Sequence, residues 1–247
     1  MKIFKRLCPN GYAAIKRNKL RIGSLSYYRK IEDQNRQDKS EGLPTILMRS
    51  PPEGRTASAI EFNNYAKAAG LPFKINNEKI KLNFKGPGVM RFESEINFLV
   101  FCTTFIDGDS LESLNDSAHL GEHLIKITDP QKFKDLIALK LLECFRDDSI
   151  KLKGIFDSVS SAMDYVRYQT KEEIDDNGGI FQSINASVDL GHAFIKPTSY
   201  SHESEYRFIW LPFDNSSGTA CQLPFGFKFI DIEVPDIWST IEDFEMN

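Results

Sequence analysis

A nearly continuous apolar and β-branched run, Ile96 to Phe105 (INFLVFCTTF), constrains the fold of this chain more than any other segment. Strands that are buried on both faces show runs of this kind, in place of the alternation of a half-exposed strand. The run therefore predicts a central strand. Alternating segments predict further strands at 3–7, 20–25, 80–84, 123–128, 193–196, 203–211 and 227–234.

A long helix is predicted from Pro130 to about Phe145. Asp129 is a capping acid, and proline suits the first helical turn. Four residues at helical spacing form one apolar stripe: Phe133, Ile137, Leu141 and Cys144. Shorter helices are predicted at 12–18 and 57–69, and residues 157–170 are predicted to pass from helix into a strand at 165–168. Helical crossovers are too few for a doubly wound sheet, so the pattern predicts an α+β fold with mainly antiparallel sheets.

The 247 residues contain no internal repeat, low-complexity tract or interdomain linker. We therefore predict a single domain over residues 1–247. Residues 29–56 are polar and rich in glycine and proline, which predicts a long loop. Long loops in compact domains are often functional lids.

The N-terminus MKIFKRLCPNGY has only a two-residue apolar stretch before its basic residues, and no apolar run approaches the roughly 20 residues that cross a bilayer. Four cysteines lie far apart without a C-x-x-C pair, which predicts free thiols. These features predict a cytoplasmic protein with no membrane partner.

Charge is unevenly distributed along the chain. The net charge is −4, yet residues 1–40 hold eleven Lys or Arg against three Asp or Glu. A basic lobe of this kind suits an anionic ligand, either a phosphorylated small molecule or a nucleic-acid backbone. The alternative is a solvated basic face that balances the acidic remainder.

An acidic pair stands out near the C-terminus, in the segment KPTSYSHESEYRFIWL (196–211). On a strand, alternate residues share a face, so Glu203, Glu205 and Arg207 are predicted to point one way and Tyr206 and its alternate neighbours toward the core. Two carboxylates about 7 Å apart on one face shift each other's pKa values and can divide roles between them. The alternative is an edge strand with a solvated polar face.

This segment, K-x3-Y-x2-E-x-E-Y-R, resembles the C-terminal signature of a large bacterial family of unknown function. Other blocks of the chain fit the same family in the same order: LRIGSLSYYRKIED, VFCTTF and GEHLIKI. The layout also resembles the ADP-ribosyltransferase fold. That resemblance implies an enzyme of the toxin or anti-phage effector type that consumes NAD, requires no metal, modifies RNA, DNA or protein, and has an antitoxin partner.

The resemblance also implies roles for individual residues. Glu205 would be the catalytic acid that stabilises the oxocarbenium-like state as the nicotinamide bond breaks, and Glu203 would position or deprotonate the acceptor. The remaining implied residues would bind NAD through phosphate, hydroxyl or stacking contacts: Arg6 or Lys5, Tyr27 or Tyr28, Arg29, Thr103 and Thr104.

Two other functions stay open on the residues alone. The first is a non-catalytic module that binds a nucleotide or nucleic acid with the same residues. The second is a zinc hydrolase, because His119, Glu122 and His123 form an H-x-x-E-H match. That motif needs a helix, whereas Gly121 and a β-like LIKI stretch predict a turn and a strand here.

Overall fold

The computed structural model describes residues 2–31, 45–50, 55–68, 77, 79–84, 88–93, 97–108, 121–146, 157–168, 174–175, 193–196, 198–216, 219–220, 223–224 and 226–245. The chain divides into two compact units. Unit 1 comprises residues 1–41, 97–170 and 193–247, and unit 2 comprises residues 42–96 and 171–192. That residues 1–247 form a single domain stays a prediction.

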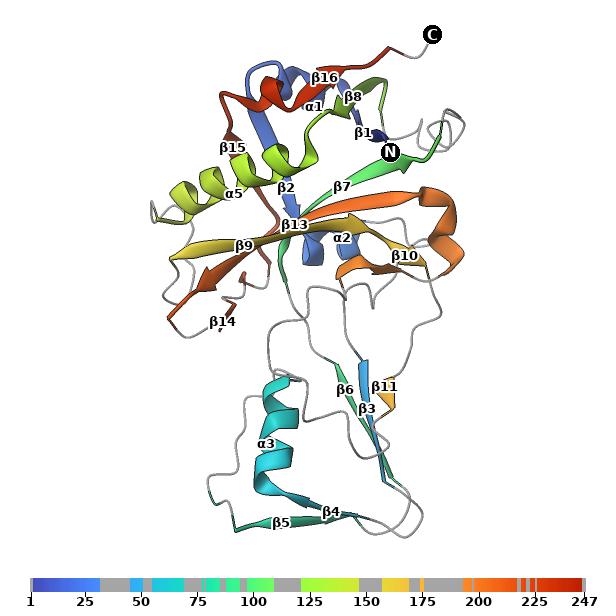
Figure 1. The fold of residues 1–247 in the computed structure, drawn as a ribbon, viewed down its shortest axis with the longest axis vertical. Helices are drawn as coiled ribbons and strands as arrows, with labels where there is room; N and C mark the ends of the chain where they lie inside the picture. The colour runs from blue at the N-terminus through green and yellow to red at the C-terminus, as the bar shows by residue number, and fades with distance from the viewer. Residues whose placement is uncertain are drawn as a thin grey trace. The chain divides into compact units, whose positions relative to one another are not determined.

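An antiparallel sheet forms the framework of unit 1 (Figure 1). Its described strands are β1 (Lys2–Leu7), β2 (Lys19–Ser24), β7 (Leu99–Ile106), β8 (His123–Ile127), β9 (Ser158–Tyr165), β13 (Glu205–Asp214), β14 (Thr219–Ala220), β15 (Phe229–Glu233) and β16 (Ile241–Asp243). The main path runs β14-β13-β7-β1-β8-β16, with β9 added on β13, β2 on β7 and β15 on β2. The predicted central strand therefore lies at the centre, as β7.

Helical segments and one small parallel pair complete the described part of unit 1. They are α1 (Pro9–Ile15), α2 (Leu25–Ile31), α5 (Pro130–Arg146), the 3-10 segments η4 (Thr198–Glu203) and η5 (Ile237–Ser239), and the strands β10 (Arg167–Tyr168) and β12 (Ile195–Lys196). The start of α5 is the one predicted from sequence, because the backbone N–H of Lys132 donates to Asp129 Oδ1 at 3.0 Å.

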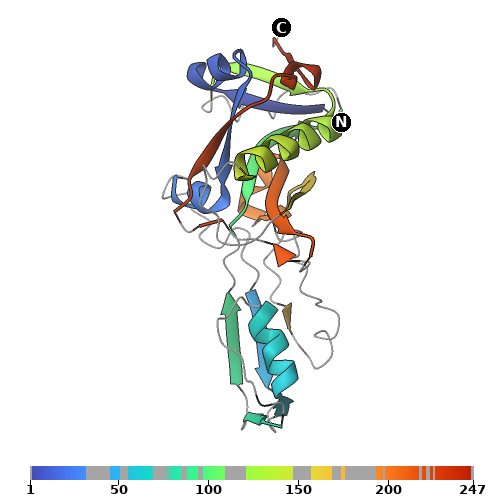
Figure 2. The same cartoon turned by 90° about the vertical axis from the view of Figure 1, so that its left-hand side faces the viewer.

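The main core lies where α5 packs against β9, β13 and β15 (Figure 2). The Phe133 ring of α5 lies 5.0 Å from Phe208 and 5.6 Å from Phe101, centroid to centroid. Trp210 is fully buried, and its indole N–H donates to the carbonyl of Lys134 at 3.0 Å. Tyr206, Phe208 and Trp210 thus form the predicted core face of β13.

Strand β7 changes partner along its length. Its C-terminal part pairs with β1, as far as Phe4 opposite Thr104, and its start pairs with β2, from Gly23 opposite Val100. Residues 101–103 therefore have no strand opposite them on that edge in the described registers, while β13 pairs with them on the other edge. We call this stretch of β7 the fork.

Unit 2 contains two small sheets and one helix among its described residues. The strands β3 (Thr45–Ser50), β6 (Gly88–Glu93) and β11 (Ile174–Asp175) form one sheet, and β4 (Arg55–Ser58) pairs with β5 (Lys81–Phe84). Helix α3 (Ala59–Ala68) begins with a reciprocal cap, since Ser58 Oγ accepts from the Glu61 N–H and Glu61 Oε2 accepts from the Ser58 N–H.

The prediction of an α+β fold with mostly antiparallel sheets and few helices is confirmed, whereas three local predictions were wrong. The predicted loop at 29–56 contains the end of α2 and the strand β3, because its prolines flank the apolar stretch Thr45–Ser50 and do not interrupt it. Residues 158–165 form a strand where a helix was predicted, since β13 pairs with them over their whole length. The acidic segment forms a strand only from Glu205.

None of the described helices has both the length and the apolar character that a membrane crossing requires. The three described cysteines, Cys8, Cys102 and Cys144, are free thiols as predicted.

Replacing Phe133 with alanine should destabilise unit 1 by about 3–5 kcal/mol, because the change leaves a cavity between α5 and the sheet. Leu139→Ala is the matched control, since Leu139 lies on the same helix and is 60% exposed. Urea unfolding monitored by circular dichroism measures both changes. Equal midpoints for the two variants would contradict the described packing.

Candidate functional site

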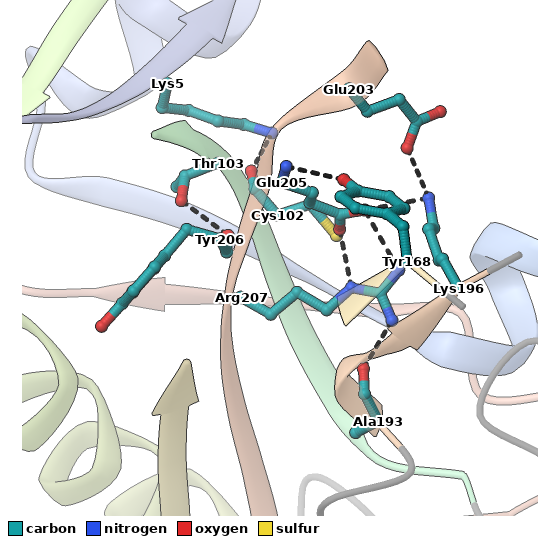
Figure 3. A network of polar contacts seen from close by, with 10 residues as sticks. All are labelled: Lys5, Cys102, Thr103, Tyr168, Ala193, Lys196, Glu203, Glu205, Tyr206 and Arg207. Carbon is teal, nitrogen blue, oxygen red and sulfur yellow. Dashed lines mark hydrogen bonds and ion pairs between the residues drawn. The ribbon is translucent and has the colours of Figure 1, made fainter. Parts of the chain in front are cut away.

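Glu205 and Arg207 form a buried ion pair on one face of β13 (Figure 3). Arg207 Nε donates to Glu205 Oε1 at 2.7 Å, and Arg207 Nη2 donates to Oε2 at 3.1 Å. Arg207 Nη1 donates to the carbonyl of Ala193 at 2.6 Å. Arg207 is 1% exposed and Glu205 6%, so this face of the strand is not the solvated edge considered as an alternative.

Lys196 joins the second glutamate to this pair. Its ammonium lies 2.9 Å from Glu205 Oε2 and 2.7 Å from Glu203 Oε2. Glu203 does not share the strand face as predicted, because it ends η4, and Ser204 adopts a left-handed backbone with φ of 43° before β13 begins. The two acids nevertheless meet, through Lys196.

Glu205 is ionised. Burial alone would raise the pKa of its carboxyl group, but the charges of Arg207 and Lys196 outweigh burial and lower the pKa well below its ordinary range. Cys102 lies opposite Arg207 in the β7–β13 register, and its thiol also contributes to lowering the pKa of the Glu205 carboxyl group. Burial, together with the negative charge of Glu205, raises the pKa of Cys102 well above its usual value, so this thiol is protonated and unreactive.

Two tyrosines lie near Glu203 and Glu205, which we call the acidic centre. Burial raises the pKa of Tyr168 to about 12, and its hydroxyl oxygen accepts a hydrogen bond from the Glu205 backbone N–H at 2.8 Å. Burial also raises the pKa of Tyr28 far above its usual value, with smaller contributions from Cys102 and Glu205. Both phenols are therefore neutral at physiological pH.

The ring of Tyr28 occupies the space left by a glycine on β2. A Cβ atom on Gly23 would lie 2.4 Å from Tyr28 Cε2, much closer than van der Waals contact permits. Gly23 faces Val100 of β7, at the edge of the fork. The small residue on β2 thus lets the α2 tyrosine pack against the sheet beside the acidic centre.

The two first-strand candidates differ in position. Lys5 Nζ donates to the carbonyl of Cys102 at 2.7 Å, inside the fork, and lies 5.1 Å from the centre of the Phe101 ring. Burial lowers the pKa of Lys5, while Cys102 and Glu205 oppose that shift. Arg6 is 8% exposed and donates to the carbonyl of Gly121 at 3.2 Å, toward β8. Lys5 is therefore the one within electrostatic reach of Glu205.

The other residues predicted to bind NAD differ in their position relative to Glu205. Thr104 lies opposite Glu205 in the β7–β13 register, on the same face. Thr103 faces the core side with Tyr206, and its hydroxyl donates to the Tyr206 carbonyl at 2.7 Å. The Tyr27 ring packs edge-on against Phe229, away from the acidic pair in the described contacts. Arg29 belongs to α2, but its side chain falls outside the described residues.

The basic N-terminal residues find acidic partners near the C-terminus. Lys16 Nζ lies 2.6 Å from Asp243 Oδ2, and Arg21 makes two hydrogen bonds of 2.8 Å to Asp231. These pairs favour the alternative in which the N-terminal positives balance the acidic remainder of the chain.

The H-x-x-E-H match lies partly outside the described residues, since His119 is not among them. His123 begins the strand β8, and its ring stacks on Tyr12 with centroids 4.1 Å apart. Within the described residues no cluster of three or more His, Cys, Asp or Glu side chains has the arrangement of a metal site.

Sequence reasoning did not assign site roles to Lys196, Arg207, Tyr168 or Cys102. Arg207 had a usable signal, because it stands two residues from Glu205 on the same strand face. Lys196 also had a signal, because it is the first residue of the K-x3-Y-x2-E-x-E-Y-R signature. Tyr168 reaches the site through the parallel pairing of β10 and β12, which no local pattern encodes. No protein-family model, curated protein or solved structure matches the chain.

Stability below pH 4.5 should depend on Glu205. The pKa of its carboxyl group is lowered on folding from an ordinary value of 4.5, so its stabilisation is complete above that pH and is lost as pH falls toward the folded pKa. In Glu205→Gln, the slope of unfolding free energy against pH in this acid range should decrease by up to about 1.4 kcal/mol per pH unit. Urea unfolding between pH 3 and 6 measures the slope, and an unchanged slope would contradict an ionised Glu205.

Gly23→Ala should destabilise unit 1 by about 1–3 kcal/mol, because the added methyl group displaces the Tyr28 ring. In the Tyr28→Ala background the same substitution should cost much less. Thermal unfolding of the four proteins in this cycle measures the coupling, and strict additivity would show that the two side chains do not compete for space.

Proposed function

We propose that the chain is an NAD-dependent ADP-ribosyltransferase-like enzyme with Glu205 as its catalytic carboxylate. The observation that carries the proposal is a buried, ionised glutamate at the first residue of β13, opposite Thr104 of β7 and within electrostatic reach of Lys5 and Tyr28. The α+β antiparallel architecture and the E-x-E signature support the same reading.

The proposed chemistry breaks the bond between nicotinamide and ribose. Positive charge develops on the ribose as nicotinamide leaves, and a fixed carboxylate stabilises that charge. Arg207 holds both oxygens of Glu205, so the carboxylate needs no reorganisation during the reaction. Glu203 has a side chain that is 28% exposed, which suits the group that orients an acceptor hydroxyl, amine or amide.

The acceptor is proposed to be RNA, DNA or protein, without a preference for nucleic acid. A basic N-terminal lobe favoured nucleic acid, yet Lys16 and Arg21 are paired with acids, and Lys5 and Arg6 donate to backbone carbonyls. Protein acceptors therefore stand equal to RNA and DNA in this proposal.

The test follows label from NAD that carries the isotope in its adenylate phosphate. The full chain is incubated with this NAD and with RNA, DNA or cell lysate, and both label transfer and nicotinamide release are measured. Glu205→Gln should lower the rate about 100-fold or more, since it removes the stabilising charge. Glu242→Gln is the matched control, because Glu242 forms an exposed 2.7 Å pair with Lys126 in the same sheet.

Glu205→Gln removes the carboxylate that pairs with the buried Arg207, so its fold is checked by near-ultraviolet circular dichroism. Glu205→Asp accompanies it, since this variant keeps the charge and retracts it by one methylene. Loss of activity in a folded Glu205→Asp supports the positional requirement. Equal, background-level transfer by the wild type and all variants with every acceptor class would refute the enzyme.

A second function is favoured by one specific observation: both oxygens of Glu205 already have partners in Arg207 and Lys196. A carboxylate saturated in this way can hold the fold and leave ligand binding to its neighbours. The second candidate is therefore a non-catalytic module for a nucleotide or nucleic acid. It predicts binding that weakens with salt and survives Glu203→Gln, measured by calorimetry.

A further inference from the structure

Lys196 contacts both glutamates of the E-x-E pair with one ammonium group (Figure 3). The distances are 2.7 Å to Glu203 Oε2 and 2.9 Å to Glu205 Oε2. Its side chain is 3% exposed, and the nitrogen lies 5.2 Å from the centre of the Tyr200 ring. A buried ammonium is costly unless it is paired, so this position requires both carboxylates.

The path of the chain at Glu203 departs from regular strand geometry. Side chains two residues apart on a strand leave the backbone about 7 Å from each other. The left-handed Ser204, with φ of 43°, turns Glu203 out of the strand direction. The Ser204 carbonyl accepts the Phe105 N–H at 2.9 Å, which holds this turn against β7.

The backbone of Lys196 belongs to a separate two-stranded sheet. It lies opposite Tyr168 in the parallel β10–β12 pair, and the Tyr168 hydroxyl accepts the Glu205 backbone N–H. Lys196 and Glu205 are thus connected twice, once through their side chains and once through Tyr168. The pairing positions the backbone of Lys196, and burial of its side chain and the contacts with both glutamates position the ammonium.

We infer that Lys196 is a positioning residue that fixes Glu203 relative to Glu205. Arg207 binds both oxygens of Glu205, so Glu205 remains in place without Lys196. For Glu203, Lys196 is the polar partner that the structure describes. This inference rests on the proposed function, in which Glu203 orients the acceptor while Glu205 meets the ribose, so the spacing of the two carboxylates sets the rate of transfer.

The first experiment measures the pair directly and does not require activity. Wild type, Lys196→Met and Lys196→Arg react with a water-soluble carbodiimide and a labelled amine, and mass spectrometry of peptides gives the labelling rate of Glu203. Lys196→Met should raise that rate about tenfold or more, the factor that corresponds to loss of a charge-assisted hydrogen bond. Lys196→Arg should restore a slow rate.

Lys126→Met is the matched control, because it breaks a Lys–Glu pair with an equal 2.7 Å contact, between β8 and β16. It should leave Glu203 labelling unchanged. A second set of variants leaves Lys196 unchanged and alters Ser204. Ser204→Val should raise the labelling rate of Glu203, because a β-branched residue strains the left-handed backbone. Ser204→Gly should not raise it, because glycine adopts that conformation readily. These variants test the inference even when Lys196→Met fails to fold.

The second experiment separates this inference from the proposed enzyme. When transfer activity is present, Lys196→Met should lower kcat with little change in KM for NAD, and Lys196→Arg should recover part of kcat. If Lys196→Met increases Glu203 labelling but the wild type has no transfer activity, the proposed enzyme is refuted and the positioning role of Lys196 is supported. If Glu203 labelling is unchanged in both Lys196→Met and Ser204→Val, the positioning role of Lys196 is overturned, whatever the activity.

Discussion

The ion pair between Glu205 and Arg207 is the interaction on which the described arrangement of unit 1 depends. Both side chains are almost completely buried, and breaking such a pair by removing one partner typically costs about 3–5 kcal/mol. Arg207 also binds the Ala193 carbonyl, Lys196 binds Glu205, and Tyr168 binds the Glu205 backbone. Glu205 and Arg207 together therefore connect three segments: β13, residues 193–196 and β10.

The same arrangement determines which groups around Glu205 are charged and which are neutral. Three cations, Lys5, Lys196 and Arg207, lie near two carboxylates, and burial removes the water that would otherwise screen them. The neighbouring phenols and the Cys102 thiol keep their protons, so they act as hydrogen-bonding groups and not as charges. A carboxylate that cations hold in a fixed position suits an enzyme that stabilises a transient positive charge, and equally a rigid structural centre.

Sequence patterns predicted the features that depend on one element alone. The central strand, the stripe of α5 with its Asp129 cap, and the core face of β13 all follow from local periodicity. The strand at 158–165 was missed because its small polar residues owe their conformation to β13. The position of Glu203 was wrong because one dihedral angle, at Ser204, redirects it. Lys196 and Tyr168 depend on a pairing of strands that lie far apart in sequence.

The parallel pairing of β10 with β12 has a topological consequence. A hairpin turn can join antiparallel neighbours, but parallel neighbours need the chain to travel back to the starting end, usually over a dozen or more residues. The stretch from Tyr168 to Ile195 makes that return, and it includes the second part of unit 2. The sequence and length of this connection can therefore change during evolution, but it cannot become a tight turn while Tyr168 and Lys196 remain paired.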